Sequence, residues 1–468
     1  MNRLLVHAKA AYRRLPPQTY DIAASAYGWY LNRWRYGPET EGLVEAALHR
    51  ENWAPDRWSS YQDERLAEIL HRAATRVPYY RAQWQARRAR GDDASWEDLA
   101  SWPVLQKDAL RTQPESFVAD DTRLSGLFRL NTSGSSGTPI TTWRSRATMR
   151  AWYALFEART RRWYGVDRSM PWAMLGGQLV VPAARTTPPF WVWNSGLRQL
   201  YMSTMHLSEA NVGAYLDALR RHEVRYLYGY ASSLYWLAEM ARQRGLEAPQ
   251  LLVAISNAEP FHPHQRDCVA DVFRCRVRDT YGMSEIVAAA TECESREMHL
   301  WPEVGIVEVL DDACDERVSP PAVGRLVCTG LLNVDMPLVR YEVGDRGALA
   351  PATHEPGQCG RRLPQLVTIE GRTNDNLVTA DGRRIFWINP VFYELPVREA
   401  QVVQESTEVI RVRVVPEEGF DDSVAMTITD RLRERLGEVR VEVERVAAIE
   451  RGPSGKFQAV INRVAERG

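Results

Sequence analysis

The sequence predicts an α/β protein. We expect a large N-terminal domain with a mainly parallel, helix-covered sheet and a small antiparallel β lobe, followed by a small α+β domain. Between residues 224 and 282, the strand-like runs VRYLYGY, LLVAIS and VRDTYG alternate with the helical runs SSLYWLAEMARQRG and PHQRDCVADVF. This alternation, with short loops between the runs, is typical of parallel strands covered by helices. In such sheets, ligands bind beyond the carboxyl ends of the strands.

Two further regions show other patterns. After Leu300, the runs VGIVEVL, VGRLVCTG and PLVRYEVG alternate over short distances, which indicates a small antiparallel lobe. Beyond Gly371, the strand-like runs VIRVRVVP and VRVEVERV flank the helical run DRLRERLG, which indicates a compact α+β domain. The segment TNDN before it has the composition of a linker.

The first 100 or so residues are expected to be helical. The run RLAEILHRAATRV places its apolar residues on one helical face, and Pro78 ends that run. A second helical pattern starts near Arg144 and carries aromatic residues close to one stripe as far as Trp163. We therefore expect an N-terminal domain at residues 1–370 and a C-terminal domain at residues 377–468.

The composition excludes several classes of protein. The chain of 468 residues carries 59 basic and 60 acidic residues, which argues against a nucleic-acid partner because such a partner requires a basic excess. Six scattered cysteines do not form a disulfide framework and favour a reducing, cytoplasmic location. The N-terminus does not have the pattern of a signal peptide, and no apolar run is long enough to span a membrane.

The segment NTSGSSGTP at residues 131–139 is the strongest local signal for a ligand site. Glycine allows the backbone to approach a ligand closely, and successive N–H groups with hydroxyl side chains can hold phosphate oxygens. The segment is not a Walker A loop, because no lysine follows its second glycine. The alternative is a flexible Ser/Gly turn, and the segment alone does not decide between the two.

Three charged residues lie in loops that suit a nucleotide site. Asp345 in RYEVGDRG is placed to bind two ribose hydroxyls, although it also suits a turn cap. Glu285 in YGMSE suits Mg²⁺, which prefers oxygen ligands, although a carboxylate is also common where a helix starts. Lys456 lies in the glycine-bracketed loop RGPSGKF, where a lysine is more often a solvated surface residue.

Seven segments in order resemble the motifs of the adenylate-forming superfamily, which comprises acyl-CoA synthetases, luciferases and peptide-synthetase adenylation domains. They are NTSGSSGTP, YGYASSLYWLA, NAEP, YGMSE, RYEVGD, IEGRTND and SGKF, and they extend over residues 131–456. The resemblance is strongest to the phenylacetate–CoA ligase-like branch, including its members found with capsular polysaccharide genes. It implies a large N-terminal domain, a hinge at residues 371–376 and a mobile C-terminal lid.

The resemblance implies a role for each motif. The loop would hold the ATP phosphates and then pyrophosphate through Ser133, Gly134, Ser135, Ser136, Gly137 and Thr138. Ala258, Glu259 and Pro260 would line the adenine pocket, with Tyr281 and Gly282 beside the base. Glu285 would bind Mg²⁺, Asp345 the ribose and Arg372 the ribose or phosphate, while Lys456 would reach the α-phosphate. Asn374 occupies the hinge position, where relatives have a carboxylate.

The resemblance leaves the substrate open. Tyr228, Tyr230, Gly176 and Gly177 are expected to form the wall of the acyl pocket. The expected reaction is ATP-dependent activation of a carboxylic acid through an acyl-AMP, with release of pyrophosphate. The acyl group then passes to coenzyme A, a carrier thiol, or an amine or hydroxyl group. The alternative is a non-catalytic adenylate-binding or scaffold protein on the same fold.

Some relatives near this branch carry a Cys/His cluster that resembles a zinc site. Cys293, His299 and Cys359 match part of it, but Gly357 stands where a Cys-x-Cys pair requires its first cysteine. Three ligands and one further residue could bind zinc. The alternative is that these three side chains are buried without a metal.

Overall fold

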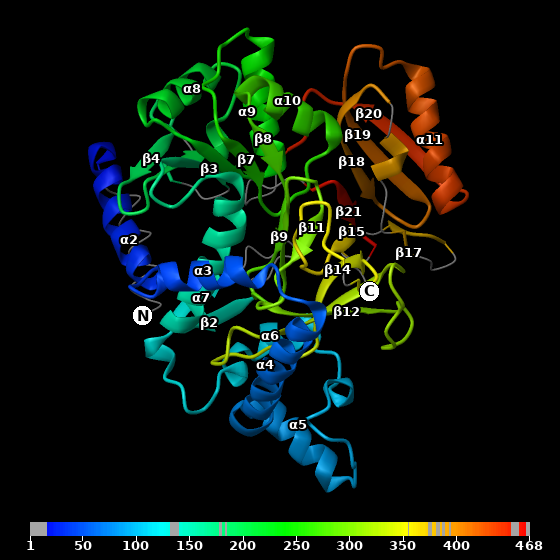
Figure 1. Cartoon of the computed structure of the whole chain (residues 1–468). Coiled ribbons are helices and arrows are strands. Elements are labelled where there is room, and N and C mark those ends of the chain that lie inside the picture. Colours follow the sequence, from blue (N-terminus) through cyan, green and yellow to red (C-terminus); the bar gives the residue numbers. More distant parts are fainter. Residues whose placement is uncertain are drawn as a thin grey trace.

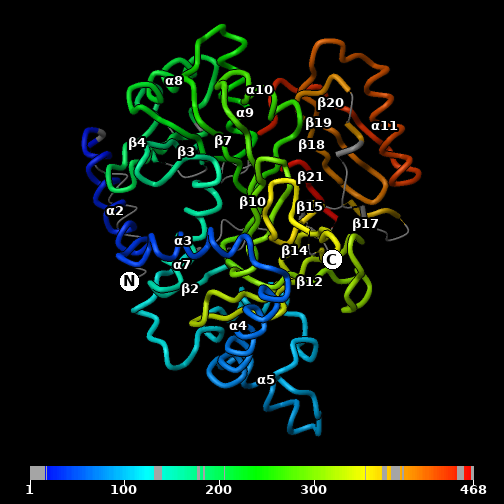
Figure 2. The backbone as a smooth tube through the Cα atoms, in the orientation of Figure 1, coloured from blue at the N-terminus to red at the C-terminus, as the bar shows by residue number. Residues whose placement is uncertain are grey.

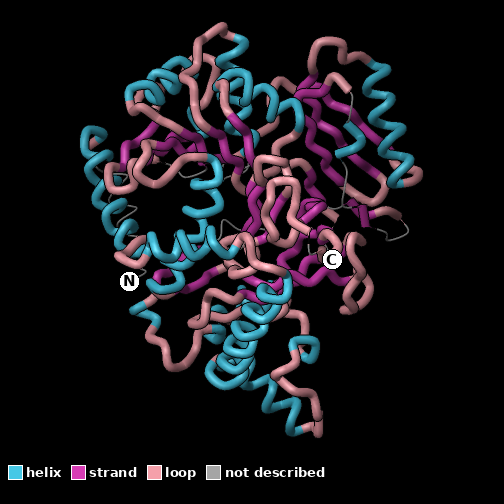
Figure 3. Tube along the Cα trace, viewed as in Figure 1, coloured by secondary structure: helices cyan, strands magenta, loops and turns pink. Residues whose placement is uncertain are grey.

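The computed structural model describes residues 16–131, 140–176, 180–182, 185–353, 355–372, 377–380, 384–385, 389–392, 395–450 and 458–464. Only helical elements precede Phe128 in these ranges, and helices and strands are intermixed after it (Figure 3). The predicted α/β class is confirmed, with a helix-covered and mainly parallel sheet, antiparallel sheets beside it and an α+β unit at the C-terminal end (Figure 1).

The N-terminal region is helical, as predicted. Its main helices are α2 (Tyr20–Arg35), α3 (Thr40–Arg50), α4 (Pro55–Arg76), α5 (Pro78–Ala89) and α6 (Lys107–Thr112). Ile69, Leu70 and Ala73 of α4 are completely buried, which confirms the predicted apolar face. Pro78 follows the end of α4 and also opens α5 as its first residue, where proline has no hydrogen bond to lose. The backbone trace in Figure 2 shows α4 and α5 forming the lower end of the molecule in that view.

A six-stranded sheet forms the centre of the N-terminal domain. Its strands are β3 (Trp172–Gly176), β4 (Trp191–Asn194), β5 (Gln199–Ser203), β6 (Tyr226–Gly229), β7 (Val253–Ser256) and β8 (Arg276–Arg278). Their order is β4-β5-β3-β6-β7-β8, and every neighbouring pair is parallel except β4 with β5. Val253 and Ile255 of β7 belong to one apolar cluster and Ala254 to another on the opposite face of the sheet, and all four residues of the strand are buried.

Helices cover this sheet and are joined to it by short loops. They include α8 (Val212–Arg221), α9 (Ala231–Gln243) and α10 (Pro263–Phe273). The helix α9 ends near Gly245, whose φ of +59° glycine adopts without strain. Leu216, Leu234 and Phe273 from these helices belong to one core cluster with the sheet.

The second predicted helix is interrupted. The helix α7 (Arg146–Phe156) is followed by a π-helical turn, Glu157–Arg161, and a 3-10 turn, Arg162–Tyr164. The expectation of one regular stripe to Trp163 was therefore wrong. The wider turn places charged side chains inside the protein, where Arg161 pairs with Glu157 at 2.8 Å. A periodicity argument that follows apolar residues does not detect such buried ion pairs.

Two antiparallel sheets follow the parallel one. The first has the order β11-β10-β9 and consists of β9 (Thr280–Gly282), β10 (Ala289–Glu292) and β11 (Met298–Leu300). The second has the order β12-β13-β14-β15 and consists of β12 (Gly305–Leu310), β13 (Gly324–Gly330), β14 (Tyr341–Leu349) and β15 (Leu366–Arg372). A separate hairpin pairs β1 (Phe128–Asn131) with β2 (Thr141–Arg144).

The C-terminal region forms its own sheet and core. The sheet has the order β20-β19-β18-β21, and the helix α11 (Asp422–Leu436) packs on it. The strands are β18 (Val397–Gln404), β19 (Val409–Pro416), β20 (Arg440–Arg445) and β21 (Val460–Asn462). This unit lies beside α9 and α10 (Figure 1), and the indole Nε1 of Trp236 donates to Glu399 Oε1 at 2.7 Å.

Among the described residues, no helix is both long enough and apolar enough to cross a membrane.

A buried carboxylate joins the N-terminal helices to the sheets. Glu303 accepts two hydrogen bonds from Arg159, at 2.7 and 2.8 Å, and one from Arg50 at 2.9 Å. Burial raises the pKa of Glu303, but attraction to these two guanidinium groups outweighs burial and holds the pKa below its usual range.

Replacing this carboxylate tests its contribution to stability. Glu303→Ala leaves two cations without their shared partner, so we expect the free energy of unfolding to fall by about 3–5 kcal/mol. Urea unfolding followed by tryptophan fluorescence measures the change. The control is Asp108→Ala, because Asp108 is 85% exposed and pairs with Arg111 at the surface, where a loss of about 0–1 kcal/mol is expected. Equal losses in the two variants would contradict the argument.

Candidate functional site

The carboxyl end of β7 brings two of the predicted motifs together. Ser256, the last residue of β7, donates from Oγ to Asp279 Oδ1 at 2.6 Å. The Ser256 carbonyl accepts a hydrogen bond from Thr280 Oγ1 at 2.7 Å. The NAEP loop, which follows Ser256, therefore starts beside the strand that carries Tyr281. The Asn257 N–H donates to the carbonyl of Gly229 at 2.7 Å, which ties the same loop to the end of β6.

The NAEP loop has an unusual backbone that its surroundings hold in place. Ala258 has a φ of +62°, in the left-handed region that residues with a β-carbon rarely adopt. Next to it, Glu259 Oε2 accepts a hydrogen bond from the N–H of Ser232 at the start of α9, at 3.1 Å. Such backbone strain occurs most often at ligand sites, where the surrounding structure compensates for it. Ala258, Glu259 and Pro260 thus lie at the edge of the sheet where a ligand is expected.

Tyr281 and Asp345 contact each other across two sheets. The Tyr281 hydroxyl on β9 donates to Asp345 Oδ2 on β14 at 2.9 Å. The backbone of Asp345 pairs with that of Arg372 at the end of β15. The structure therefore brings these three predicted residues to one place, and Gly282 follows Tyr281 at an exposed position.

Glu285 has two neighbours that the sequence did not reveal. The Tyr341 hydroxyl donates to Glu285 Oε1 at 2.9 Å, and Arg144 Nη2 donates to the carbonyl of Ser284. Burial lowers the pKa of Arg144 to about 10, while attraction to Tyr153 and Glu285 opposes that shift. Tyr341 lies within the RYEVGD motif, so the sequence contained a signal that it belongs to the site. No sequence motif distinguished Arg144 from the other arginines.

Aromatic side chains of β3 and α7 pack against Tyr228 of β6. Tyr228 on β6 meets the edges of Phe156 and Trp172, with ring centroids 5.6 and 6.4 Å apart. Burial raises the pKa of Tyr228 to about 12, so its phenol stays protonated near neutral pH. Gly176 ends β3, where an added β-carbon would collide with the Tyr201 hydroxyl. Tyr230 caps α9, so Gly176, Tyr228 and Tyr230 lie at the same edge of the sheet.

The sequence is similar to two groups of characterised proteins. Residues 377–463 match the family described as the CapK C-terminal domain. Protein CapK of Staphylococcus aureus is 24% identical over 410 residues, covering 86% of this chain and 89% of CapK. Phenylacetate-coenzyme A ligase of Thermus thermophilus is 26% identical over 368 residues, covering 73% of this chain and 74% of that enzyme.

A solved structure shows the same fold. It is 2-hydroxyisobutyryl-CoA ligase in the postadenylation state, with a TM-score of 0.66 and 23% identity over 88% of this chain and 91% of that one. In sequence the chain is similar to the phenylacetate–CoA ligase-like branch of the adenylate-forming superfamily, and its fold agrees with that similarity. The resemblance stated from its motifs is thereby confirmed.

Several residues that the superfamily motifs single out lie outside the described residues. They are Ser133, Gly134, Ser135, Ser136, Gly137, Thr138, Gly177, Asn374 and Lys456. The Ser/Gly segment connects β1 and β2, whose described ends pair Asn131 with Thr141. The roles of these residues stay predictions.

One charged residue of a superfamily motif lies away from the site. Arg340 in RYEVGD is buried in the antiparallel lobe, where it pairs with Glu308 at 3.2 Å and donates to the carbonyl of Trp102. Its contacts are those of a structural residue.

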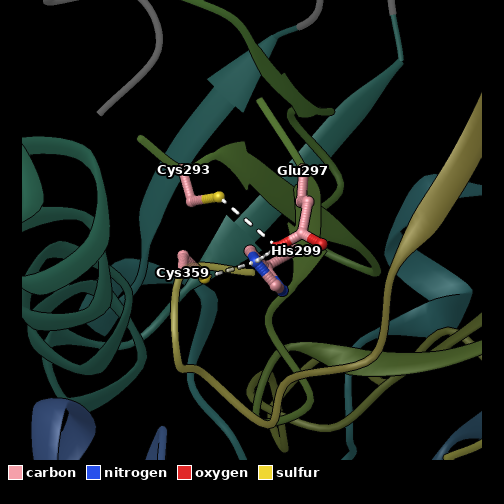
Figure 4. Close-up of side chains that lie close together, drawn as sticks. All are labelled: Cys293, Glu297, His299 and Cys359. Atoms are coloured by element: carbon pink, nitrogen blue, oxygen red, sulfur yellow. Dashed lines mark hydrogen bonds and ion pairs between the residues drawn. The ribbon is translucent and has the colours of Figure 1, made fainter. Parts of the chain in front are cut away.

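The predicted Cys/His residues do come together. Cys293, His299 and Cys359 point toward one another, and Glu297 joins them (Figure 4). Burial raises the pKa of Cys293 to about 11 and lowers the pKa of His299. Glu297 was not predicted, although the spacing Cys-x3-Glu-x-His in residues 293–299 was a signal for it.

Proposed function

We propose that this protein activates a carboxylic acid with ATP. The carboxylate oxygen attacks the α-phosphorus, the bond from that phosphorus to the bridging oxygen of pyrophosphate breaks, and an acyl-AMP forms. An acceptor then displaces AMP from the acyl carbon. The observation that carries the proposal is the convergence of Tyr281, Asp345 and Glu285 beside the strained NAEP loop. The relatives named phenylacetate-coenzyme A ligase support it.

The contacts of the site suit ATP. In this proposal Ala258, Glu259 and Pro260 contact the adenine, and the Tyr281 ring lies against it. The hydrogen bond from Tyr281 fixes the orientation of the Asp345 carboxylate, which accepts hydrogen bonds from the ribose hydroxyls. Tyr341 similarly orients Glu285, whose oxygens suit Mg²⁺. Bound Mg²⁺ would offset the negative charge of the phosphates.

The use of lysine in this chain supports a special role for Lys456. Of the 59 basic residues, only Lys9, Lys107 and Lys456 are lysines, and all the others are arginines. An ammonium group is a compact point charge on a flexible stem, whereas a guanidinium group is a rigid planar fork. A lysine in the SGKF loop of such an arginine-rich chain fits a role for which arginine is a poor substitute. We propose that Lys456 contacts the α-phosphate and stabilises the charge that develops there.

The first step requires no protein nucleophile. The substrate carboxylate is itself the attacking group and pyrophosphate is a stable leaving group, so positioning and electrostatics account for the rate. Arg372 and the Ser/Gly loop would add positive charge and N–H donors around the phosphates. The C-terminal domain would act as a lid that excludes water and then moves to admit the acceptor.

The aromatic cluster around Tyr228 suits the acyl group. Tyr228, Phe156 and Trp172 present ring edges and faces, and the protonated phenol of Tyr228 can donate one hydrogen bond. We propose an acid with an apolar or aromatic body. Coenzyme A is the acceptor that the names of the relatives support, and a carrier thiol, an amine or a hydroxyl group are the alternatives.

Exchange of pyrophosphate into ATP tests the first step directly. We expect exchange with the wild-type protein that depends on one class of acid in a panel of aryl, aliphatic and amino acids. Lys456→Ala should lower the exchange rate about 100- to 1000-fold, as for loss of one group that stabilises the transition state. Lys107→Ala is the matched control, because Lys107 lies at the start of α6 in another part of the chain, and its rate should match the wild type.

The products distinguish the alternatives. Release of AMP and pyrophosphate supports adenylation, whereas ADP would show a phosphotransferase. If the protein binds ATP in calorimetry but exchanges no pyrophosphate with any acid, the non-catalytic adenylate-binding protein takes precedence.

We expect the Asp345 carboxylate to strengthen the binding of ATP. Asp345→Ala removes the acceptor of the ribose hydroxyls, so the KM for ATP should rise about 10- to 100-fold, the value of one or two charge-assisted hydrogen bonds. The KM for the acid should change little. Tyr281→Phe keeps the ring and loses only the hydrogen bond to Asp345, so a smaller rise is expected. Glu316→Ala changes an exposed carboxylate of the same lobe and serves as the control. An unchanged KM for ATP in Asp345→Ala would exclude the ribose role.

A further inference from the structure

Four potential metal ligands, none of them a residue of the proposed nucleotide site, gather around β11 and the turn before it. His299 Nε2 lies 3.1 Å from Cys359 Sγ and 3.5 Å from Glu297 Oε2, and Cys293 Sγ lies 3.9 Å from the same Glu297 oxygen. All four ligand atoms lie within 4.8 Å of one another. Tetrahedral zinc with bonds of about 2.0–2.3 Å separates its ligand atoms by about 3.3–3.8 Å. The side chains, which point to a common centre in Figure 4, therefore have nearly the spacing that zinc requires.

The backbone holds three of the residues in two tight turns and His299 in strand β11. Cys293 and Glu297 bracket the turn between β10 and β11, where the Cys293 N–H donates to the carbonyl of Glu297 at 2.8 Å. Cys359 lies in a second turn, closed by a hydrogen bond from the Gly360 N–H to the carbonyl of Gly357 at 2.9 Å. Because both turns are fixed by the main chain, the side chains converge without a long flexible segment.

The imidazole of His299 is oriented for a metal. Its Nδ1 lies 3.3 Å from the carbonyl of Leu363, so in the neutral tautomer the Nδ1–H donates to that oxygen. The lone pair of Nε2 then points toward Cys359 and Glu297. This arrangement, in which a carbonyl fixes the far nitrogen, is the usual support of a zinc-bound histidine.

Glu297 occupies the room that a side chain at position 357 would need. A β-carbon added to Gly357 would lie 2.6 Å from Glu297 Oε2, the oxygen that faces Cys293 and His299. The other oxygen, Oε1, accepts a hydrogen bond from the Gln358 N–H at 3.2 Å. Position 357 is where a Cys-x-Cys pair would place its first cysteine. The carboxylate thus stands where a third thiolate would otherwise be.

We propose that Glu297 is the fourth ligand of a zinc site formed with Cys293, His299 and Cys359. Two thiolates, one carboxylate and a neutral imidazole around Zn²⁺ leave one net negative charge. Arg361 follows Cys359 by two residues in the sequence and provides a positive charge beside the cluster. A set of four protein ligands leaves no position for water or substrate, so the site is structural. It joins the β10–β11 turn to the 357–361 turn and does not rest on the proposed function.

Metal content and cobalt spectra test the proposal with a readout independent of activity. The full chain, purified under reducing conditions, should contain about one zinc ion by plasma mass spectrometry. Replacement by Co²⁺ should give intense visible bands of tetrahedral cobalt and a thiolate-to-cobalt charge-transfer band. Glu297→Gln should weaken zinc binding at least about 10-fold in competition with a chromophoric chelator, since removing a direct ligand costs more than removing a residue that only hydrogen-bonds to a ligand. Glu294→Gln, on the same turn and paired with Arg361, is the matched control and should bind zinc like the wild type.

A double variant tests the exchange of ligands. Glu297→Gly/Gly357→Cys removes the carboxylate and places a thiol in the room that it leaves, so zinc affinity should return and the charge-transfer band should become stronger than in the wild type. Zinc binding by Glu297→Gln with wild-type affinity would overturn the role of Glu297. A wild-type chain that contains no zinc and takes up none on dialysis against it would overturn the whole site.

Discussion

Asp279 forms the junction on which the candidate site depends. It lies between β8 of the parallel sheet and β9 of the three-stranded sheet, and its carboxylate accepts hydrogen bonds from Ser256 Oγ, the Phe261 N–H and Arg266. These donors come from the end of β7 and from α10 and the residues before it. Burial raises the pKa of Asp279, and the nearby Arg266 opposes that shift. One carboxylate therefore fixes both ends of the NAEP loop relative to Tyr281.

Two tyrosines extend this junction to the antiparallel lobe. Tyr281 reaches from β9 to Asp345 on β14, and Tyr341 reaches from β14 back to Glu285, which follows β9. Both contacts join a hydroxyl to a carboxylate, so each fixes the direction of a negative charge before a ligand arrives. A carboxylate that is already oriented need not be ordered when the ligand binds, so the entropic cost of binding is lower. The proposed ribose and magnesium ligands are thus positioned by the joint between two sheets, not by either sheet alone.

The sequence predicted those features that depend on local patterns. The strands of the parallel sheet are short, apolar and separated by helices, so their alternation identified the architecture, and the glycine-rich and acidic motifs indicated the edge at which a ligand is expected. Contacts that arise between distant segments were beyond such reasoning. Arg144 reaches Ser284 from another hairpin, and Glu297 meets Cys359 only because two turns pack together. The π-helical turn after α7 was also missed, since its buried charges are explained by partners such as Glu303, far along the chain.

The contacts of the C-terminal domain bear on how it would work as a lid. Trp236 of α9 donates a hydrogen bond to Glu399, and the guanidinium of Arg398 lies 5.8 Å from the centre of the same indole. A charge-assisted hydrogen bond and a cation–π contact together contribute on the order of 2–4 kcal/mol. A ligand that binds one arrangement of the domain 100-fold better than another shifts the balance by about 2.7 kcal/mol. A 100-fold difference in nucleotide affinity between two arrangements would therefore be enough to offset the contact at Trp236. Movement of the domain would require no rearrangement of either core, because Trp236 and Glu399 meet at the boundary between them.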